Sequence, residues 1–355
     1  MKKAFFILML LSVVSGVSAG EVVGCAPFSI DQPSKGGAVV DAANFGLKED
    51  GIPEENVIAI QKAIEHCKSV KAYKLMIPKG IYKLRSWHDK PVHNQLAYTK
   101  TSMLNPPVVY QILIDGMQDF ILDGNGAEFL FLDTEKEAMG AFIHVSNCLR
   151  VRVENLTIDW DWENRPLAAI TLIEKINIEE QYIDWYVPYL RLPSDLKVNM
   201  EKGTGGKPWN LATNMRPPEV RPFVLEDNSP GFAGVDAQNI ERSEVLDEKH
   251  IRIYFNKKSV VQKAKVGQCV NMTFHTNYDP HGIEAINNDH LTFRNLNIYA
   301  ALNHRGFSAD YNKYLEISGV KIIPRPGTGR TKSSHGTFEI HNSRGYFLCE
   351  NNVVD

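Results

Sequence analysis

Carboxylates, histidines and arginines that could do chemistry gather in two stretches of the sequence, near residue 160 and between residues 279 and 341. They are Asp159, Asp161, Asp279, His281, His304, Arg305, Asp310, Arg330, His335, Glu339 and His341. Two carboxyl groups at one site can hydrolyse a glycosidic bond, because one protonates the leaving oxygen while the other activates water or attacks the sugar. We take Asp310, His335 and Glu339 as catalytic candidates, since they fall in the last two complete intervals of a repeat described below.

A second set of residues could bind a sugar. The substrate-binding candidates are Asp159, Trp160, His304, Arg305 and Arg330. Trp162 and Tyr299 could also stack on sugar rings through their aromatic faces. Each candidate also has a structural interpretation: Asp159 could end a strand, His304-Arg305 could form a turn, and a surface acid is most often a solvated charge.

The motifs of other reaction classes are missing from the sequence. There is no Ser/His/Asp order and no nucleophile elbow. The segment KGTGGKPW at 202–209 is not a phosphate loop, because Pro208 stands where Ser or Thr would bind magnesium. The histidines lack metal-ligand spacing and the five cysteines contain no Cys-x-x-Cys pair, so we expect no metal or other cofactor. Calcium on acidic turns stays open as an alternative, and the cysteines are expected to be buried apolar thiols.

A repeated strand pattern could bring the candidate residues together. Five segments read inward-x-inward-x-(Gly/Asn)-inward-x-inward: FILDGNGA from Phe120, VRVENLTI from Val151, LTFRNLNI from Leu291, LEISGVKI from Leu315 and FLCENNVV from Phe347. The fifth position of each is Gly124, Asn155, Asn295, Gly319 or Asn351, and these two residue types tolerate a left-handed bend. The pattern predicts an all-β, right-handed parallel β-helix, with a β-sandwich as the alternative. Outward positions of successive turns of such a helix form one face.

The rest of the chain is expected to flank this β-helix. Apolar residues at Val57, Ile60, Ile64 and Cys67 predict a helix over 54–67 that caps the first turn, followed by a strand over 75–82. Strand-like pieces between 158 and 287 predict an inserted antiparallel, barrel-like β-domain. The predicted domains are 1–19, a signal peptide; 20–164, the cap and first turns; 165–275, the insertion; and 276–355, the continuing β-helix, which stops within its fifth turn and so suggests a piece of a longer protein.

The N-terminus indicates export. Lys2 and Lys3 precede a short apolar run over 4–14 and small residues at 17–19, the order of a secretory signal peptide and too short for a membrane span. We expect a periplasmic or extracellular protein, with a lipid anchor at Cys25 as the alternative. The net charge of −3 gives no polycation signature for nucleic acid.

The motifs also carry a family resemblance. The segments NFGLKEDG, AIQKAI and LMIPKGIYKL within residues 40–85 resemble the N-terminal signature of the pectate-lyase-like β-helix superfamily. Over 145–355, NLTIDWDWENRPLAAITLIE, VGQCVNM and HGIEAINNDHLTFRNLNIYAALNHRGFSADYNKYLEISGVKIIPRPGTGR look like family 110 glycoside hydrolases. That resemblance implies an exo-acting α-1,3-galactosidase with a β-barrel inserted in a β-helix and an inverting mechanism.

The sequence departs from the family pattern after the Pro-x-Gly-x-Gly-Arg segment. The family has an Asp and then a His-Phe pair before the next Arg-Gly turn, whereas this chain has Gly336 and Glu339-Ile340, with His335 and His341 nearby. The acidic pair of the family's following turn would fall beyond Asp355. We therefore expect an exported glycoside hydrolase that cleaves terminal α-galactosyl or related bonds of an oligosaccharide or polysaccharide. A polysaccharide lyase and a non-catalytic carbohydrate-binding β-helix protein are the alternatives, and the sequence leaves the oligomeric state open.

Overall fold

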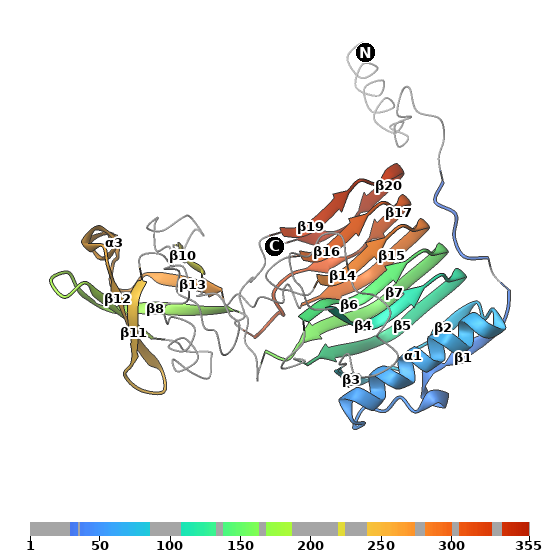
Figure 1. Ribbon diagram of the computed structural model, residues 1–355, viewed down its shortest axis with the longest axis horizontal. Helices are drawn as coiled ribbons and strands as arrows, with labels where there is room; N and C mark the ends of the chain where they lie inside the picture. The colour runs from blue at the N-terminus through green and yellow to red at the C-terminus, as the bar shows by residue number, and fades with distance from the viewer. Residues whose placement is uncertain are drawn as a thin grey trace, which may run out of the picture.

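The computed structural model describes residues 29–34, 36–85, 108–132, 138–162, 168–186, 219–223, 240–273, 281–299, 305–328 and 336–354 (Figure 1). Within these residues the chain forms two parallel sheets of ten and five strands and one antiparallel sheet of six strands. The ten-stranded sheet contains β1 (Val39–Asp41), β2 (Lys74–Met76), β3 (Ile81–Leu84), β5 (Gln118–Phe131), β7 (Leu149–Trp160), β15 (Asp289–Ile298), β17 (Lys313–Ser318), β18 (Lys321–Ile322), β20 (Arg344–Glu350) and β21 (Val353–Val354). The five-stranded sheet contains β4 (Val108–Asp115), β6 (Ala138–Ser146), β14 (His281–Ile286), β16 (Arg305–Asp310) and β19 (Gly336–His341).

The two parallel sheets are built from the same stacked coils. Each coil places one strand in the five-stranded sheet and the next in the ten-stranded sheet, as β6 and β7 or β16 and β17 do. The five segments predicted to repeat are in register, because Phe120, Val151, Leu291, Leu315 and Phe347 are paired in series. The prediction of a mostly-sheet fold with stacked parallel strands is confirmed.

Left-handed residues make the predicted bends in four of the five segments. The φ angles are 57° at Asn155, 53° at Asn295, 65° at Gly319 and 55° at Asn351. In the first segment the predicted bend at Gly124 is wrong, since Asn125 and Gly126 carry the positive φ angles of 50° and 79°. The register shifts between Asp123 and Ala127, so extra residues bulge out of β5 and move the bend.

A stacked apolar core fills the space between the two parallel sheets. Phe131 and Phe142 stack at 4.4 Å between ring centroids, and Phe142 stacks on Trp160 at 5.7 Å. Phe293 and Phe307 meet edge-on at 5.0 Å. Each such side chain gains about 1.5–3 kcal/mol when its burial is complete, which requires that neighbouring coils cover one another.

The helix α1 (Pro53–Val70) lies over the first strands and contacts η1 (Ala42–Phe45), β1, β2, β3 and β4 (Figure 1). It starts at Pro53, which suits the first helical position. Its predicted apolar stripe is buried, and Lys71 ends it with a φ of 54°. The strand predicted over 75–82 is instead two strands, β2 and β3, because the Pro78–Gly80 turn interrupts it.

The antiparallel sheet is separate from the coils in Figure 1. Its strands are β8 (Ala168–Asn177), β9 (Tyr182–Tyr186), β10 (Glu219–Phe223), β11 (Ile240–Val245), β12 (His250–Phe255) and β13 (Cys269–Thr273), with the short helix α3 (Lys258–Lys263) beside β12. Five of these strands overlap the strand-like pieces that the sequence shows at 169–178, 182–192, 221–225, 251–255 and 266–274, and β11 was not predicted. Ile183, Trp185, Ile253 and Phe255 are buried on one side of the sheet.

The cysteines are partly as expected. Cys67 and Cys148 are buried free thiols, and burial raises the pKa of each to about 12. The free Cys349 is exposed, so the expectation of a buried thiol is wrong there. Cys25 and the side chain of Cys269 lie outside the described residues. Among the described residues, no helix combines the length and apolar character needed to cross a membrane.

Candidate active site

The outward face of the five-stranded sheet carries a column of polar side chains. Strand pairing places one residue from each of four strands in line: His144, Glu284, Ser308 and Glu339. The residues on either side of this line in each strand, such as Ile143 and Val145, are in the core cluster. Because side chains alternate along a strand, the four polar residues point away from the core. We call these four residues the polar column.

The inner end of the polar column is a buried ionisable pair. His144 Nδ1 lies 2.7 Å from Glu284 Oε2, and the two side chains are only 4% and 6% exposed. The other carboxylate oxygen of Glu284 lies 3.6 Å from His281 Nδ1. The ring of Tyr110, from β4, lies 4.1 Å from the imidazole of His144 between centroids. Removing two polar side chains from water costs free energy that their mutual hydrogen bond offsets only in part, so burial of this pair needs an explanation other than stability.

The outer end of the polar column is open. Glu339 is 29% exposed and its Oε2 lies 2.8 Å from Nε2 of His341, which is 51% exposed. Asp310 lies on the same side of the sheet, since it is two residues beyond Ser308 and in register with His341. Asn342 Nδ2 donates to Asp310 Oδ1 at 3.0 Å. The five-stranded sheet therefore carries four carboxylates on its outward face, those of Asp115, Glu284, Asp310 and Glu339.

The spacing of these carboxylates follows from the sheet geometry. Parallel strands lie about 4.8 Å apart and a residue advances about 3.3 Å along a strand. The Cα atoms of Asp310 and Glu339 are then roughly 8 Å apart, and those of Glu284 and Glu339 roughly 9.5 Å apart. Either pair is therefore close enough along the sheet for its two carboxyl groups to reach one glycosidic bond.

The predicted catalytic residues fall partly within this face. Asp310 and Glu339 lie on neighbouring strands of it. His335 lies outside the described residues, as do the substrate-binding candidates His304 and Arg330. Arg305 begins β16 in register with Gly336, and its side chain is not described.

The predicted pair Asp159 and Trp160 lies elsewhere, at the end of β7 in the ten-stranded sheet. Asp159 is fully buried, and Arg325 Nη1 donates to its Oδ2 at 2.6 Å. Arg325 also binds Glu128 through two hydrogen bonds, and hydrogen bonds from Arg325 to Glu128 and Asp159 raise the pKa of its guanidinium. Trp160 is 4% exposed and packs against Phe142. In this arrangement Asp159 neutralises an arginine and Trp160 contributes to the core.

Sequence reasoning missed His144 and Glu284. The strands FIHVSN, GIEAIN, GFSADYN and TFEIHN share an apolar-polar-apolar pattern followed by a bend, so they form a second repeat beside the one that begins at Phe120. Their bends carry positive φ angles of 54° at Asn147, 56° at Asn287, 56° at Tyr311 and 45° at Asn342. Alignment on these bends places His144, Glu284, Ser308 and Glu339 at one position.

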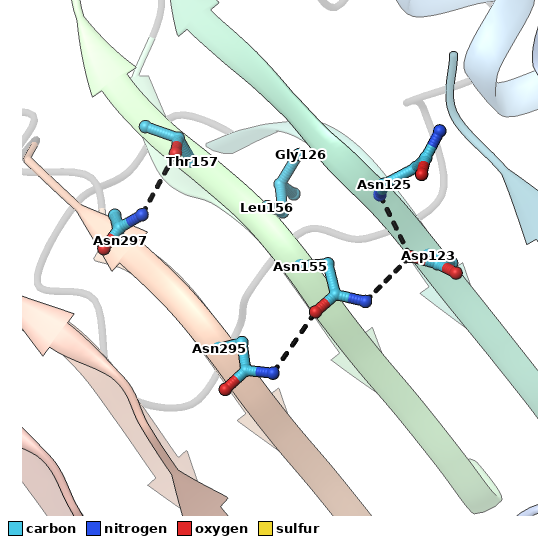
Figure 2. Close-up of a pocket in the computed structure, with 8 residues that line it drawn as sticks. All are labelled: Asp123, Asn125, Gly126, Asn155, Leu156, Thr157, Asn295 and Asn297. Atoms are coloured by element: carbon cyan, nitrogen blue, oxygen red, sulfur yellow. Dashed lines mark hydrogen bonds between the residues drawn. The ribbon is translucent and has the colours of Figure 1, made fainter. Parts of the chain in front are cut away.

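A pocket of about 400 Å³ lies at the other row of bends, in the ten-stranded sheet (Figure 2). Its side chains bond to one another: Asn155 donates to Asp123 at 3.0 Å and Asn295 donates to Asn155 at 3.3 Å. Lys74 lies 2.8 Å from Asp123. Burial alone would raise the pKa of Asp123, but hydrogen bonds, first among them that from Lys74, hold it below its usual value. These hydrogen bonds pair the polar side chains of successive bends with one another, so the pocket is interpreted as structural.

Comparison with known proteins places the chain near bacterial galactosidases. It is 24% identical over 317 residues to α-1,3-galactosidase B of Bacteroides thetaiotaomicron, covering 88% of this chain and 48% of the relative. It is 23% identical over 198 residues to α-1,3-galactosidase A of Shewanella woodyi, covering 54% of this chain and 28% of the relative. The chain therefore spans about half, or less, of the length of these curated relatives. The predicted resemblance to α-1,3-galactosidases is confirmed at low identity.

The chain was also compared with protein-family models and with solved structures. No family model matches the sequence. Among solved structures, a hyperthermoactive exopolygalacturonase from Thermotoga maritima aligns with a TM-score of 0.36 and 10% identity, over 92% of this chain and 70% of that chain.

Proposed function

We propose that this chain carries the active-site face of a glycoside hydrolase that removes terminal α-linked galactosyl residues from an oligosaccharide or polysaccharide. The observation that carries the proposal is the placement of Asp310 and Glu339 on one outward face, with Cα atoms roughly 8 Å apart. Similarity to two α-1,3-galactosidases supports the choice of sugar.

Asp310 and Glu339 would act as the acid and base of a single displacement. One carboxyl group protonates the glycosidic oxygen as the bond from that oxygen to the anomeric carbon breaks. The other carboxylate accepts a proton from water as the water oxygen attacks the opposite side of that carbon. The inverting route is the one that the resemblance to family 110 glycoside hydrolases implies; a route with a covalent intermediate would need carboxyl groups at about 5–5.5 Å.

The remaining predicted site residues belong to the same proposal. His304 and His335 immediately precede β16 and β19, the strands that carry Asp310 and Glu339. Arg305 and Arg330 are placed near the same strand starts by sequence, so all four are proposed to contact the substrate. Asp159 and Trp160 are proposed to support the neighbouring part of the scaffold through Arg325 and Phe142.

The proposal includes the finer architecture. We propose that the coils form a right-handed β-helix, that α1 caps its first coil, and that residues 165–275 are an inserted domain built on the six-stranded sheet. The boundaries at residues 164 and 275 fit this arrangement, since the strands on either side belong to different sheets. Residues 1–19 would direct export to the periplasm or the cell exterior, where the glycan substrate is found.

The test is hydrolysis of a nitrophenyl α-galactoside and of an α-1,3-linked galactosyl disaccharide, with a nitrophenyl β-galactoside as the control. We expect release of galactose from the two α-linked substrates only. Proton NMR of the first product should show β-galactose, which then mutarotates to the α-anomer. Initial release of α-galactose would contradict the inverting assignment. Products from a uronate polymer that absorb in the ultraviolet would instead identify a lyase, and binding without turnover would identify a carbohydrate-binding protein.

A further inference from the structure

We propose that Nε2 of His144 hydrogen-bonds a hydroxyl group of the terminal sugar, and that Glu284 fixes the orientation of this imidazole for the purpose. The inference rests on the proposed glycosidase function and adds a specificity-determining residue to it. His144 and Glu284 have no part in the acid and base roles of Asp310 and Glu339.

The pair geometry leaves one ring nitrogen of His144 for a ligand. Glu284 Oε2 lies 2.7 Å from Nδ1, so the carboxylate occupies that nitrogen. An ionised carboxylate only accepts hydrogen bonds, so Nδ1 carries the proton between the two groups. Nε2 is then the ring nitrogen that remains to bond a ligand. Among the described residues, no hydrogen bond is made by Nε2 of His144.

Neighbouring side chains hold the imidazole in place. The Tyr110 ring covers one of its faces at 4.1 Å between centroids, with an angle of 32° between the planes. The second oxygen of Glu284 faces His281 at 3.6 Å, which restricts rotation of the carboxylate. A recognition group needs this kind of support, because a loose imidazole would lose orientational entropy when it binds a sugar.

The placement of the pair argues against a purely structural role. The strand neighbours Ile143 and Ile283 point into the core, where apolar side chains provide the packing and no polar pair is needed. His144 and Glu284 lie on the opposite face, in the line that ends at Glu339. Replacement of both partners of a buried hydrogen bond by apolar groups of the same shape can leave stability unchanged, so the pair is better explained by binding.

The polar column offers hydrogen-bonding groups over the length of a sugar. His144 and Glu339 are separated by three strand spacings, roughly 14 Å between Cα atoms. Glu284 and Ser308 lie between them in the same line, so a hexosyl ring lying along the column would meet a polar side chain at each strand. A hydroxyl group both donates and accepts hydrogen bonds, so it can bond to Nε2 of His144. The ligand class is therefore the non-reducing terminal hexose of the substrate.

The test compares two His144 variants on nitrophenyl α-galactoside and on its 2-, 4- and 6-deoxy analogues. The amide of His144→Gln reaches the position of Nε2, whereas the amide of His144→Asn overlaps Nδ1. We expect His144→Asn to lower kcat/KM on the galactoside about 10- to 100-fold, the value of one directed hydrogen bond. His144→Gln should recover part of that loss. On the one analogue that lacks the recognised hydroxyl, wild type and His144→Asn should be equal.

His250→Asn is the matched control, because His250 Nδ1 lies 2.7 Å from Asp247 in the six-stranded sheet, away from the polar column. It should leave all four rates unchanged. Equal losses by His144→Asn on all four substrates would overturn the inference while the hydrolase proposal stands. If the wild type hydrolyses nothing, a galactose-induced rise in Tm that His144→Asn abolishes keeps the inference and removes the hydrolase. Absence of both hydrolysis and the Tm rise overturns both.

Discussion

The two parallel sheets are built from the same coils, but their acidic side chains have different partners. Four acids of the ten-stranded sheet pair with lysine or arginine at 2.5–3.1 Å. The pairs are Lys74–Asp123, Arg150–Asp119, Arg294–Glu316 and Lys313–Asp289. In the part of the five-stranded sheet that the structure describes, the acids contact histidine, asparagine or serine side chains, as Glu284, Glu339, Asp310 and Asp115 do. The five strands of that sheet contain a single Arg or Lys, Arg305.

This difference separates acids that hold the fold from acids that can transfer a proton. A permanently charged partner favours the ionised carboxylate, as seen for Asp119 and Asp123, whose pKa values are lowered. Such a carboxylate is a poor general acid. Asp310 and Glu339, which contact an asparagine and a histidine, are the carboxyl groups proposed to transfer protons. The comparison predicts that substitutions on the two sheets have opposite effects on activity and stability.

The largest effect is expected for Asp310→Asn and Glu339→Gln. Each removes one proton-transferring group and keeps the size of the side chain, so kcat should fall about 10²- to 10⁴-fold. The unfolding midpoint in urea should change little, because Glu339 is partly exposed and the Asp310 contact with Asn342 can persist. Steady-state kinetics and urea unfolding monitored by fluorescence measure the two quantities.

Glu350→Gln is the control, since Glu350 lies exposed on β20 of the ten-stranded sheet. It should match wild type in both measurements. Full activity of Asp310→Asn would remove Asp310 from the site. A loss of stability parallel to the loss of rate would show that these acids hold the fold as those of the other sheet do.

The second prediction concerns Glu316→Gln, which should destabilise the protein without changing its rate. Glu316 is 5% exposed and accepts hydrogen bonds from Arg294, Ser318 and Gln32. Loss of its charge leaves Arg294 with a neutral partner, at a cost of about 1–3 kcal/mol in the free energy of unfolding. Glu244→Gln is the matched control, because its pair with Arg242 is exposed and 3.9 Å long. That control should stay within about 0.5 kcal/mol of wild type.

The sequence predicted the register of the ten-stranded sheet because inward residues and bend residues repeat there together. Asn155 and Asn295 could be identified as bends since few other residues accept a positive φ. The shift from Gly124 to Asn125 and Gly126 could not be predicted, because a bulge depends on how β5 pairs with β7.

The candidate site was harder to predict than the fold. Glu284 stands between Ile283 and Ala285, which fits any outward strand position, and its partner His144 lies 140 residues earlier. A tryptophan such as Trp160 can stack on a sugar ring or pack in the core. Its contact with Phe142, which the sequence does not reveal, places it in the core. Asp310 and Glu339 were found because sequence intervals place them on adjacent coils, which is a property of the scaffold.

The smallest effect is expected in the pH dependence of stability. Hydrogen bonds from Arg150 lower the pKa of Asp119 to about 2 in the folded chain, although partial burial acts in the opposite direction. An unfolded aspartate has a pKa near 3.9, so the folded state favours the ionised carboxylate. The resulting stabilisation is complete above about pH 4 and is lost as the pH falls toward about 2. Because water and salt screen a pair near the surface, the contribution should be at most about 1 kcal/mol.

The measurement is urea unfolding of wild type and Asp119→Asn between pH 2 and pH 7. The two free energies of unfolding should differ at neutral pH and converge at the acidic end. A difference in the free energy of unfolding that stays constant at every pH would show that Asp119 acts through its shape and hydrogen bonds. Charge pairing would then not be what distinguishes the acids of the ten-stranded sheet from those of the polar column.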